Sequence, residues 1–126
     1  MPTALELTPE AMAIYRATAQ RRWQAEHLAL QQRRQLAWQL ARQAAALLKK
    51  KFKATQVVVF GSLVHPDCFT PWSDVDLAAW GILPEDTFRA MGAVMDLGQE
   101  IEINLVDAGA CRSSVLETIE REGIRL

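Results

Sequence analysis

The longest stretch of this chain without glycine or proline places the strongest constraint on its fold. It runs from Glu10 to Phe60, and alanine, glutamine, leucine and arginine dominate most of it. These residues have high helix propensities. Thr8-Pro9-Glu10 offers a hydroxyl N-cap, a proline at the first helical position and an acid in the first turn. The sequence therefore predicts a helix from residue 9 to about 52, roughly 65 Å long if it is a single rod.

Such a helix is longer than a domain of 126 residues is wide, so we expect it either to bend into a hairpin or to project towards a partner. The polar run QQRRQ at 31–35 is the predicted break. Two apolar stripes flank it at helical spacing. The first is sparse and is expected to meet a partner or a second copy of the chain, whereas the second is expected to lie on a sheet. The stripes consist of Met12, Tyr15, Ala19, Trp23 and Leu30, and of Leu36, Leu40, Ala44 and Leu47.

Shorter elements follow the predicted helix. Strands are predicted at Gln56–Phe60, at Val75–Trp80, at Glu100–Val106 and, briefly, in the final IRL, with helices at Pro84–Leu97 and 109–122. Helices interleaved with a few strands are typical of an α/β or α+β fold. We therefore predict a small mixed sheet of three to four strands packed with helices over residues 45–126, preceded by an N-terminal helical extension over residues 1–44.

The charge of the chain is unevenly distributed. Residues 1–53 hold ten Lys or Arg against three Asp or Glu, and residues 54–126 hold four against twelve. The basic half is more simply explained by docking against acidic protein surface than by nucleic acid, so nucleic-acid binding is disfavoured. The sequence also lacks a long apolar run, and MPTALELTPEAM lacks the layout of a signal peptide. A soluble cytoplasmic protein without a membrane segment is therefore expected.

Two predicted strands carry the residues most suited to chemistry. The first ends in Gly61-Ser62, and the second begins at Asp74-Val75-Asp76. Alternate residues of a strand share a face, so the two carboxylates leave the same side of the sheet. Carboxylates this close repel each other unless a cation neutralises them, and Mg²⁺ prefers oxygen ligands together with substrate phosphates. A Gly-Ser turn can present backbone N–H groups and a hydroxyl to a phosphate. Together these residues are suited to nucleotidyl transfer.

With these motifs the sequence resembles the minimal nucleotidyltransferases of the DNA polymerase β-like superfamily, including its small antitoxin-type members. The matching pattern is Phe60-Gly61-Ser62, eleven residues, then Asp74-Val75-Asp76, with EINLVDA as the strand that usually carries a third acid. The resemblance covers roughly residues 45–126. It departs from the family at Asn104, which stands where the third carboxylate belongs, and in the loop after Ser62, which lacks the usual basic run.

The resemblance implies a site and a reaction. Asp74 and Asp76 would bind Mg²⁺, Glu102 or Asn104 would complete the catalytic set, and the nucleotide-binding residues would be Gly61, Ser62 and Ser73. The donor would be ATP, and AMP would pass to a hydroxyl of a macromolecular acceptor. For small members that acceptor is often a tyrosine of a partner toxin with a HEPN domain, so a small helical toxin-like protein is the expected partner.

Two other readings remain open at the level of sequence. Asn104 and the long helix also suit a protein that has kept the fold, has lost the reaction and acts by binding its partner. The basic N-terminal half would suit a nucleic-acid-directed transferase, which ranks last. A homodimer through the first helix is a further expectation, and the sequence does not identify the acceptor or the preferred nucleotide.

Overall fold

The computed structural model describes residues 8–126. They divide into two compact units, the first ending at Gln32 and the second spanning Arg33–Leu126. Residues 1–7 of the predicted N-terminal extension lie outside the described residues. Besides short 3-10 helices, they form three α-helices and four strands in the order α1 (Pro9–Lys51), β1 (Gln56–Phe60), β2 (Val75–Trp80), α2 (Thr87–Leu97), β3 (Ile103–Asp107), α3 (Ser113–Glu122) and β4 (Ile124–Arg125).

Helix α1 is one uninterrupted helix of 43 residues. The backbone N–H of Ala11 donates to the Thr8 hydroxyl at 3.1 Å, which confirms the predicted N-cap. Of the two alternatives left open by the sequence, the structure has the continuous helix, without a break at 31–35. No glycine or proline interrupts this run, and its two arginines are held by hydrogen bonds to a loop (below). Among residues 8–126, no helix has an apolar stretch long enough to span a bilayer.

Up to Gln32 the side chains of α1 are almost all exposed. The larger apolar ones among them include Tyr15, which is 67% exposed, and Trp23, which is 62% exposed. The Trp23 indole stacks on the His27 ring, with centroids 5.1 Å apart and planes 6° from parallel. This unit therefore carries aromatic surface, and its use as a partner or dimer surface stays a prediction.

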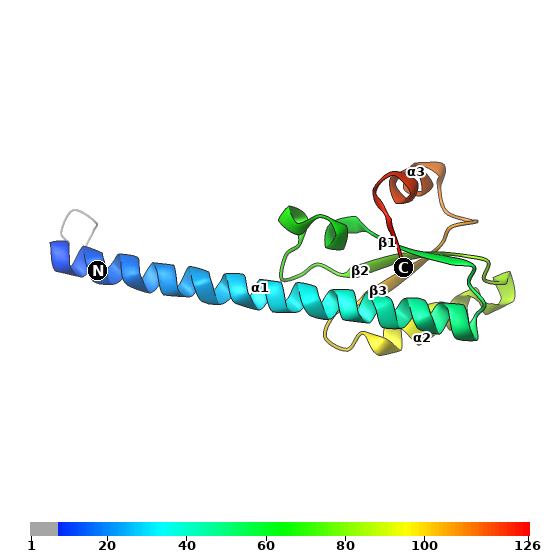
Figure 1. Cartoon of the computed structure of the whole chain (residues 1–126), viewed down its shortest axis with the longest axis horizontal. Coiled ribbons are helices and arrows are strands. Elements are labelled where there is room, and N and C mark those ends of the chain that lie inside the picture. The colour runs from blue at the N-terminus through cyan, green and yellow to red at the C-terminus, as the bar shows by residue number, and fades with distance from the viewer. Residues whose placement is uncertain (1–7) are drawn as a thin grey trace. The chain divides into compact units, whose positions relative to one another are not determined.

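The four strands form one mixed sheet in the order β3-β2-β1-β4 (Figure 1). Strand β1 pairs antiparallel with β2 and with β4, whereas β2 pairs parallel with β3. This arrangement confirms the predicted α+β class with a small mixed sheet. The register places Asp76 beside Phe60 on one side and beside Asn104 on the other. Residues from three segments of the sequence therefore meet at one end of the sheet.

Helices cover both faces of the sheet, and α2 and α3 lie on opposite sides of it (Figure 1). On the α3 side, Val58, Ala78 and Ile119 form a buried cluster. The opposite side is more apolar, because Val57, Val59, Leu77 and Ile103 alternate away from that cluster and are fully buried. The second half of α1 supplies further buried side chains to the core, namely Ala37, Leu40, Ala41, Ala44, Ala45 and Leu48.

Three elements differ in their bounds from the predictions. The helix predicted at Pro84–Leu97 forms as the 3-10 helix η4 (Pro84–Asp86) followed by α2. The strand predicted at Glu100–Val106 forms at Ile103–Asp107, and the helix predicted at 109–122 forms only at Ser113–Glu122. Between them, the Asp107 carboxylate accepts the backbone N–H of Gly109 at 3.0 Å. Such a side-chain bond to the backbone competes with helix and holds a turn, so α3 begins only after it.

Candidate functional site

The Gly-Ser turn lies directly against the second aspartate of the Asp-x-Asp pair. Strand β1 ends at Phe60, and Gly61 adopts φ 77° as the 3-10 helix η2 (Gly61–Val64) begins. A Cβ at Gly61 would lie 2.6 Å from Asp76 Oδ2. Position 61 therefore requires glycine for two reasons, its left-handed backbone conformation and the close approach of the Asp76 carboxylate.

Asp74 and Asp76 stand at the start of β2, as predicted. Asp74 immediately precedes the strand, and Asp76 is its second residue. Both are partly exposed, whereas Val75 between them and Leu77 after them are fully buried. The alternation thus places the two aspartates on the face that does not hold Leu77, and buried neighbours fix the strand that carries them.

Asn104 is brought to Asp76 by the parallel pairing of β2 and β3. The two residues are register partners, and Asn104 Nδ2 donates to Asp76 Oδ1 at 3.4 Å. Glu102 precedes β3, and its carbonyl accepts the Val75 N–H at 2.9 Å. The structure therefore brings together four predicted site residues, Gly61, Asp76, Asn104 and, through its charge, Glu102.

Electrostatics at Asp76 are unfavourable to its charged form. Burial raises the pKa of Asp76 above its ordinary value of 3.8, and the negative charges of Asp74 and Glu102 raise this pKa further. The hydrogen bond from Asn104 acts in the opposite direction and lowers it. A cation beside the carboxylates would remove the repulsion, so the donor set fits a hard divalent ion such as Mg²⁺.

The fit to Mg²⁺ depends on two carboxylates and not on a complete set of protein ligands. Among residues 8–126, no three His, Cys, Asp or Glu side chains are grouped so that they could hold a metal ion. Mg²⁺ commonly takes one or two carboxylates and fills its remaining positions with water and substrate phosphate. Asp74 and Asp76 are therefore the residues that would hold it, and Glu102 as a third ligand stays a prediction.

Ser62 and Ser73 differ in their hydrogen bonds. The Ser73 hydroxyl accepts the Thr70 N–H at 2.8 Å and lies 3.2 Å from the Thr70 hydroxyl, so it closes the turn before Asp74. Ser62 lies in η2, where its carbonyl accepts the His65 N–H at 3.1 Å. Ser62 therefore occupies the turn that the phosphate-binding hypothesis needs, while the hydroxyl of Ser73 already has partners within the loop.

Sequence reasoning missed two arginines beside the site. Arg33 and Arg34 belong to the polar run 31–35, to which the sequence assigned no role in the site, and both are half-buried. Arg33 donates to the Ser73 carbonyl at 3.0 Å, and Arg34 donates to the Leu63 carbonyl at 3.1 Å. Helical spacing in the sequence places Arg33 three and seven residues before Leu36 and Leu40 of the second stripe, on the same side of the helix. It does not show the loop carbonyls that the two arginines reach.

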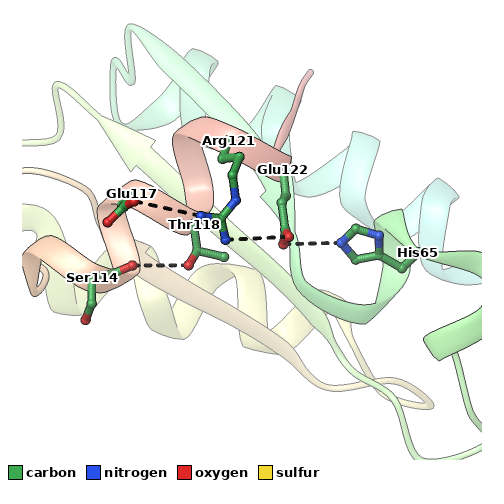
Figure 2. Close-up of polar contacts among 6 residues, drawn as sticks. All are labelled: His65, Ser114, Glu117, Thr118, Arg121 and Glu122. Carbon is green, nitrogen blue, oxygen red and sulfur yellow. Dashed lines mark hydrogen bonds and ion pairs between the residues drawn. The ribbon is translucent and has the colours of Figure 1, made fainter.

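A polar chain also ties the loop after Gly61-Ser62 to α3 (Figure 2). His65 Nε2 lies 3.3 Å from a carboxylate oxygen of Glu122, whose other oxygen lies 3.7 Å from Arg121. Arg121 also faces Glu117 at 3.8 Å. Partly exposed pairs of this kind contribute little to stability, and their effect here is to hold the loop near the end of α3.

Comparison with known proteins identifies the fold. No protein-family model matches the chain, and no curated protein matches it in sequence. Solved structures do match, and those described here are toxin–antitoxin structures. One is a MntA-HpeT mutant with two aspartate-to-glutamate substitutions. The match to it has TM-score 0.55 and 13% sequence identity, and it covers 68% of this chain and 70% of that chain.

Two further structures agree. A toxin–antitoxin with AMP-PNP gives TM-score 0.53 at 17% identity, over 64% of this chain and 66% of that one. A MntA-HpeT mutant with a tyrosine-to-alanine substitution gives 0.55 at 18% identity, over 68% and 69%. At such identities the likeness concerns the fold, which these structures share with this chain and which confirms the predicted fold class.

The raised pKa of Asp76 leads to a testable prediction. The folded protein binds the Asp76 proton more tightly than the unfolded chain does, so the charged carboxylate costs stability at neutral pH. That cost disappears as the pH falls through the raised pKa towards the ordinary value. We expect Asp76→Asn to increase the free energy of unfolding at pH 7, by less than about 1 kcal/mol because solvent screens this partly exposed carboxylate. The gain should shrink towards acid pH, as measured by urea denaturation.

The matched control is Asp67→Asn, which changes an exposed carboxylate in the loop that leads to β2 and should change the free energy of unfolding at pH 7 by less than about 0.5 kcal/mol. The electrostatic account would be contradicted if Asp76→Asn were no more stable than the wild type at pH 7, or if its extra free energy of unfolding did not vary with pH.

Proposed function

We propose that this protein is a Mg²⁺-dependent nucleotidyltransferase that transfers AMP from ATP to a hydroxyl of a macromolecular acceptor. One observation carries the proposal: the Gly-Ser turn and the Asp-x-Asp pair, twelve positions apart from Ser62 to Asp74, meet where the Gly61 backbone abuts the Asp76 carboxylate. A turn suited to phosphate beside carboxylates suited to Mg²⁺ is the arrangement that nucleotidyl transfer requires. The AMP-PNP in one structure of the same fold supports ATP as the donor.

In this proposal each residue of the site has a defined role. Gly61 and Ser62 lie against the phosphates, and Asp74 and Asp76 hold Mg²⁺. Asn104 orients Asp76 through its 3.4 Å hydrogen bond, and Ser73 holds the turn that leads into Asp74. When bound, Mg²⁺ would offset the phosphate charge and favour the in-line geometry. Glu102 adds negative charge near Asp76, which strengthens the attraction for a cation.

The transfer step itself is a substitution at phosphorus. The acceptor hydroxyl oxygen forms a bond to the α-phosphorus of ATP, the bond from that phosphorus to the oxygen bridging the β-phosphate breaks, and pyrophosphate leaves. The hydroxyl proton must pass to a base. Asn104 cannot accept it because an amide is not basic, so we assign that role to a carboxylate of the site.

The acceptor that fits best is a protein. The second unit, Arg33–Leu126, forms a single sheet with its helices. The structures of the same fold are toxin–antitoxin structures. We therefore propose an antitoxin role in which the acceptor is a tyrosine of a small helical toxin of the HEPN type, and we retain the cytoplasm as the expected location.

Calorimetry tests the donor site. ATP titrated into the wild-type protein with Mg²⁺ should bind, and binding should be lost both without Mg²⁺ and in the Asp74→Ala/Asp76→Ala variant. We expect the affinity to fall at least about a hundredfold, or about 2.8 kcal/mol, because phosphate binding here depends on the cation. Asp67→Ala, in an exposed part of the same loop, is the matched control and should bind as the wild type does.

A second function is favoured by one specific observation. Asn104 takes the position of the third carboxylate and donates its amide to Asp76, which suits a protein that binds its partner without catalysis. If wild type shows no Mg²⁺-dependent ATP binding, and Asp74→Ala/Asp76→Ala retains the full biological effect on the partner, this binding role replaces the transferase.

A further inference from the structure

The segment between the Gly-Ser turn and the Asp-x-Asp pair is held from outside at both of its ends. Arg34 donates to the carbonyl of Leu63, one residue after Ser62, at 3.1 Å. Arg33 donates to the carbonyl of Ser73, one residue before Asp74, at 3.0 Å. Both arginines belong to α1 and to the same compact unit as the loop. Two consecutive residues of a helix therefore hold both ends of the segment.

The burial of these arginines shows that the contacts are not incidental surface contacts. Both side chains are half-buried, and the Nε atoms of Arg33 and Arg34 are buried without a hydrogen-bond partner. A buried, unsatisfied donor on a charged group is costly. Hydrogen bonds from a cation to a carbonyl are stronger than neutral ones and stronger still away from water. Within residues 8–126, the hydrogen bonds from Arg33 and Arg34 to the loop carbonyls offset this cost.

The consequence lies in the rigidity of the helix. Residues 33 and 34 are adjacent in α1, so their separation is fixed by helix geometry. Their two acceptors, the carbonyls of Leu63 and Ser73, are therefore both tied to one short segment of α1, which restrains their separation, although ten positions separate them in the sequence. Gly61-Ser62 and Asp74 flank these anchor points directly, and a displacement of about 1 Å is enough to impair a catalytic site.

We propose that Arg33 and Arg34 are positioning residues that set the spacing between the Gly-Ser turn and the Asp-x-Asp pair. The effect on nucleotide affinity rests on the proposed function, whereas the effect on the segment does not. By this inference the working site includes α1 from Arg33 onward, which is not contained in a nucleotidyltransferase domain confined to residues 45–126.

The experiment uses the full chain with Arg33→Met/Arg34→Met, which keeps an aliphatic stem and removes the donors. Amide hydrogen exchange by NMR follows His65, Ser73 and Val75, whose N–H groups are hydrogen-bonded in the structure. We expect their exchange to accelerate at least about tenfold, the change that corresponds to about 1.4 kcal/mol in the opening equilibrium. Amides of Val57 and Val59 in β1 should exchange as in the wild type.

Nucleotide affinity provides the second readout. Mg²⁺-ATP should bind the double variant about tenfold more weakly than the wild type. Arg33→Lys/Arg34→Lys, which retains one cationic donor at each position, should recover part of both effects. The matched control is Arg42→Met, at an exposed position of the same helix, and it should change neither readout. A role in holding the helix alone would accelerate exchange throughout the unit, the β1 amides included.

The outcomes separate the two proposals. Loop amides that exchange as in the wild type, or a general acceleration that includes β1, would overturn the positioning role. Faster loop exchange in a protein whose wild type does not bind Mg²⁺-ATP would support the positioning role and reject the proposed function. If the double variant does not fold, the single variants decide. Arg34→Met should accelerate amide exchange at His65, and Arg33→Met should accelerate it at Ser73 and Val75. Unchanged exchange in either single variant would overturn the proposal.

Discussion

Gly61→Ala is expected to destabilise the protein by about 3 kcal/mol and to abolish Mg²⁺-dependent ATP binding. Two independent effects add here. An alanine at φ 77° is strained, and its Cβ would lie 2.6 Å from Asp76 Oδ2, so either the turn or the carboxylate must move; each effect costs about 1–3 kcal/mol. Urea denaturation measures the stability, and calorimetry measures the nucleotide affinity.

The matched control is Gly92→Ala in α2, where an added Cβ meets nothing within 4 Å. Alanine in a helix interior is favoured over glycine by about 0.5–1 kcal/mol, so this variant should be slightly more stable than the wild type and should keep its affinity for ATP. If Gly61→Ala is as stable as Gly92→Ala, the close contact between Gly61 and Asp76 is not a feature of the folded protein in solution.

Removing residues 1–44 is expected to unfold what remains, whereas removing residues 1–31 is expected to leave a cooperatively folded protein. The first deletion takes away the buried side chains Ala37, Leu40, Ala41 and Ala44 of α1, together with both arginines that hold the loop. Loss of this apolar burial alone costs about 5 kcal/mol, which is comparable to the total stability of a typical domain, about 5–15 kcal/mol.

The shorter deletion supplies the control, because it retains the complete second unit from Arg33. Circular dichroism and urea denaturation should show a cooperative transition for residues 32–126 and none for residues 45–126. A cooperative transition and a dispersed NMR spectrum for residues 45–126 would instead support the domain boundary predicted from the sequence, and would show that α1 is dispensable for folding.

The local elements of this fold were predictable because they depend on short-range pattern. The strands Gln56–Phe60 and Val75–Trp80 were predicted with the bounds that the structure has, since a short, largely apolar run bounded by turn residues predicts a strand. The cap at Thr8 was also readable, because capping is a contact over three residues. The strand at Ile103–Asp107 was placed too early, since the apolar alternation begins at Ile101, before the residues that actually pair.

The arrangement of the candidate site was predictable only in part. Alternation along β2 predicted that Asp74 and Asp76 share a face, and the resemblance suggested that Asn104 would lie near them. That Gly61 touches Asp76 depends on the antiparallel register of β1 with β2. That Asn104 donates to Asp76 depends on the parallel register of β2 with β3. Registers are set by pairing between distant segments, which no local pattern contains.

The sequence by itself therefore determined the helix, the strands, the class of fold and the residue types of the site. The tertiary structure alone decided that α1 is uninterrupted, and it decided that Arg33 and Arg34 are half-buried groups bonded to the loop. A run of polar residues in a sequence indicates exposure on average, but hydrogen-bond acceptors elsewhere in the chain can make burial of an arginine favourable. Those acceptors, the carbonyls of Leu63 and Ser73, are backbone atoms, which every residue carries, and only folding brings them within reach.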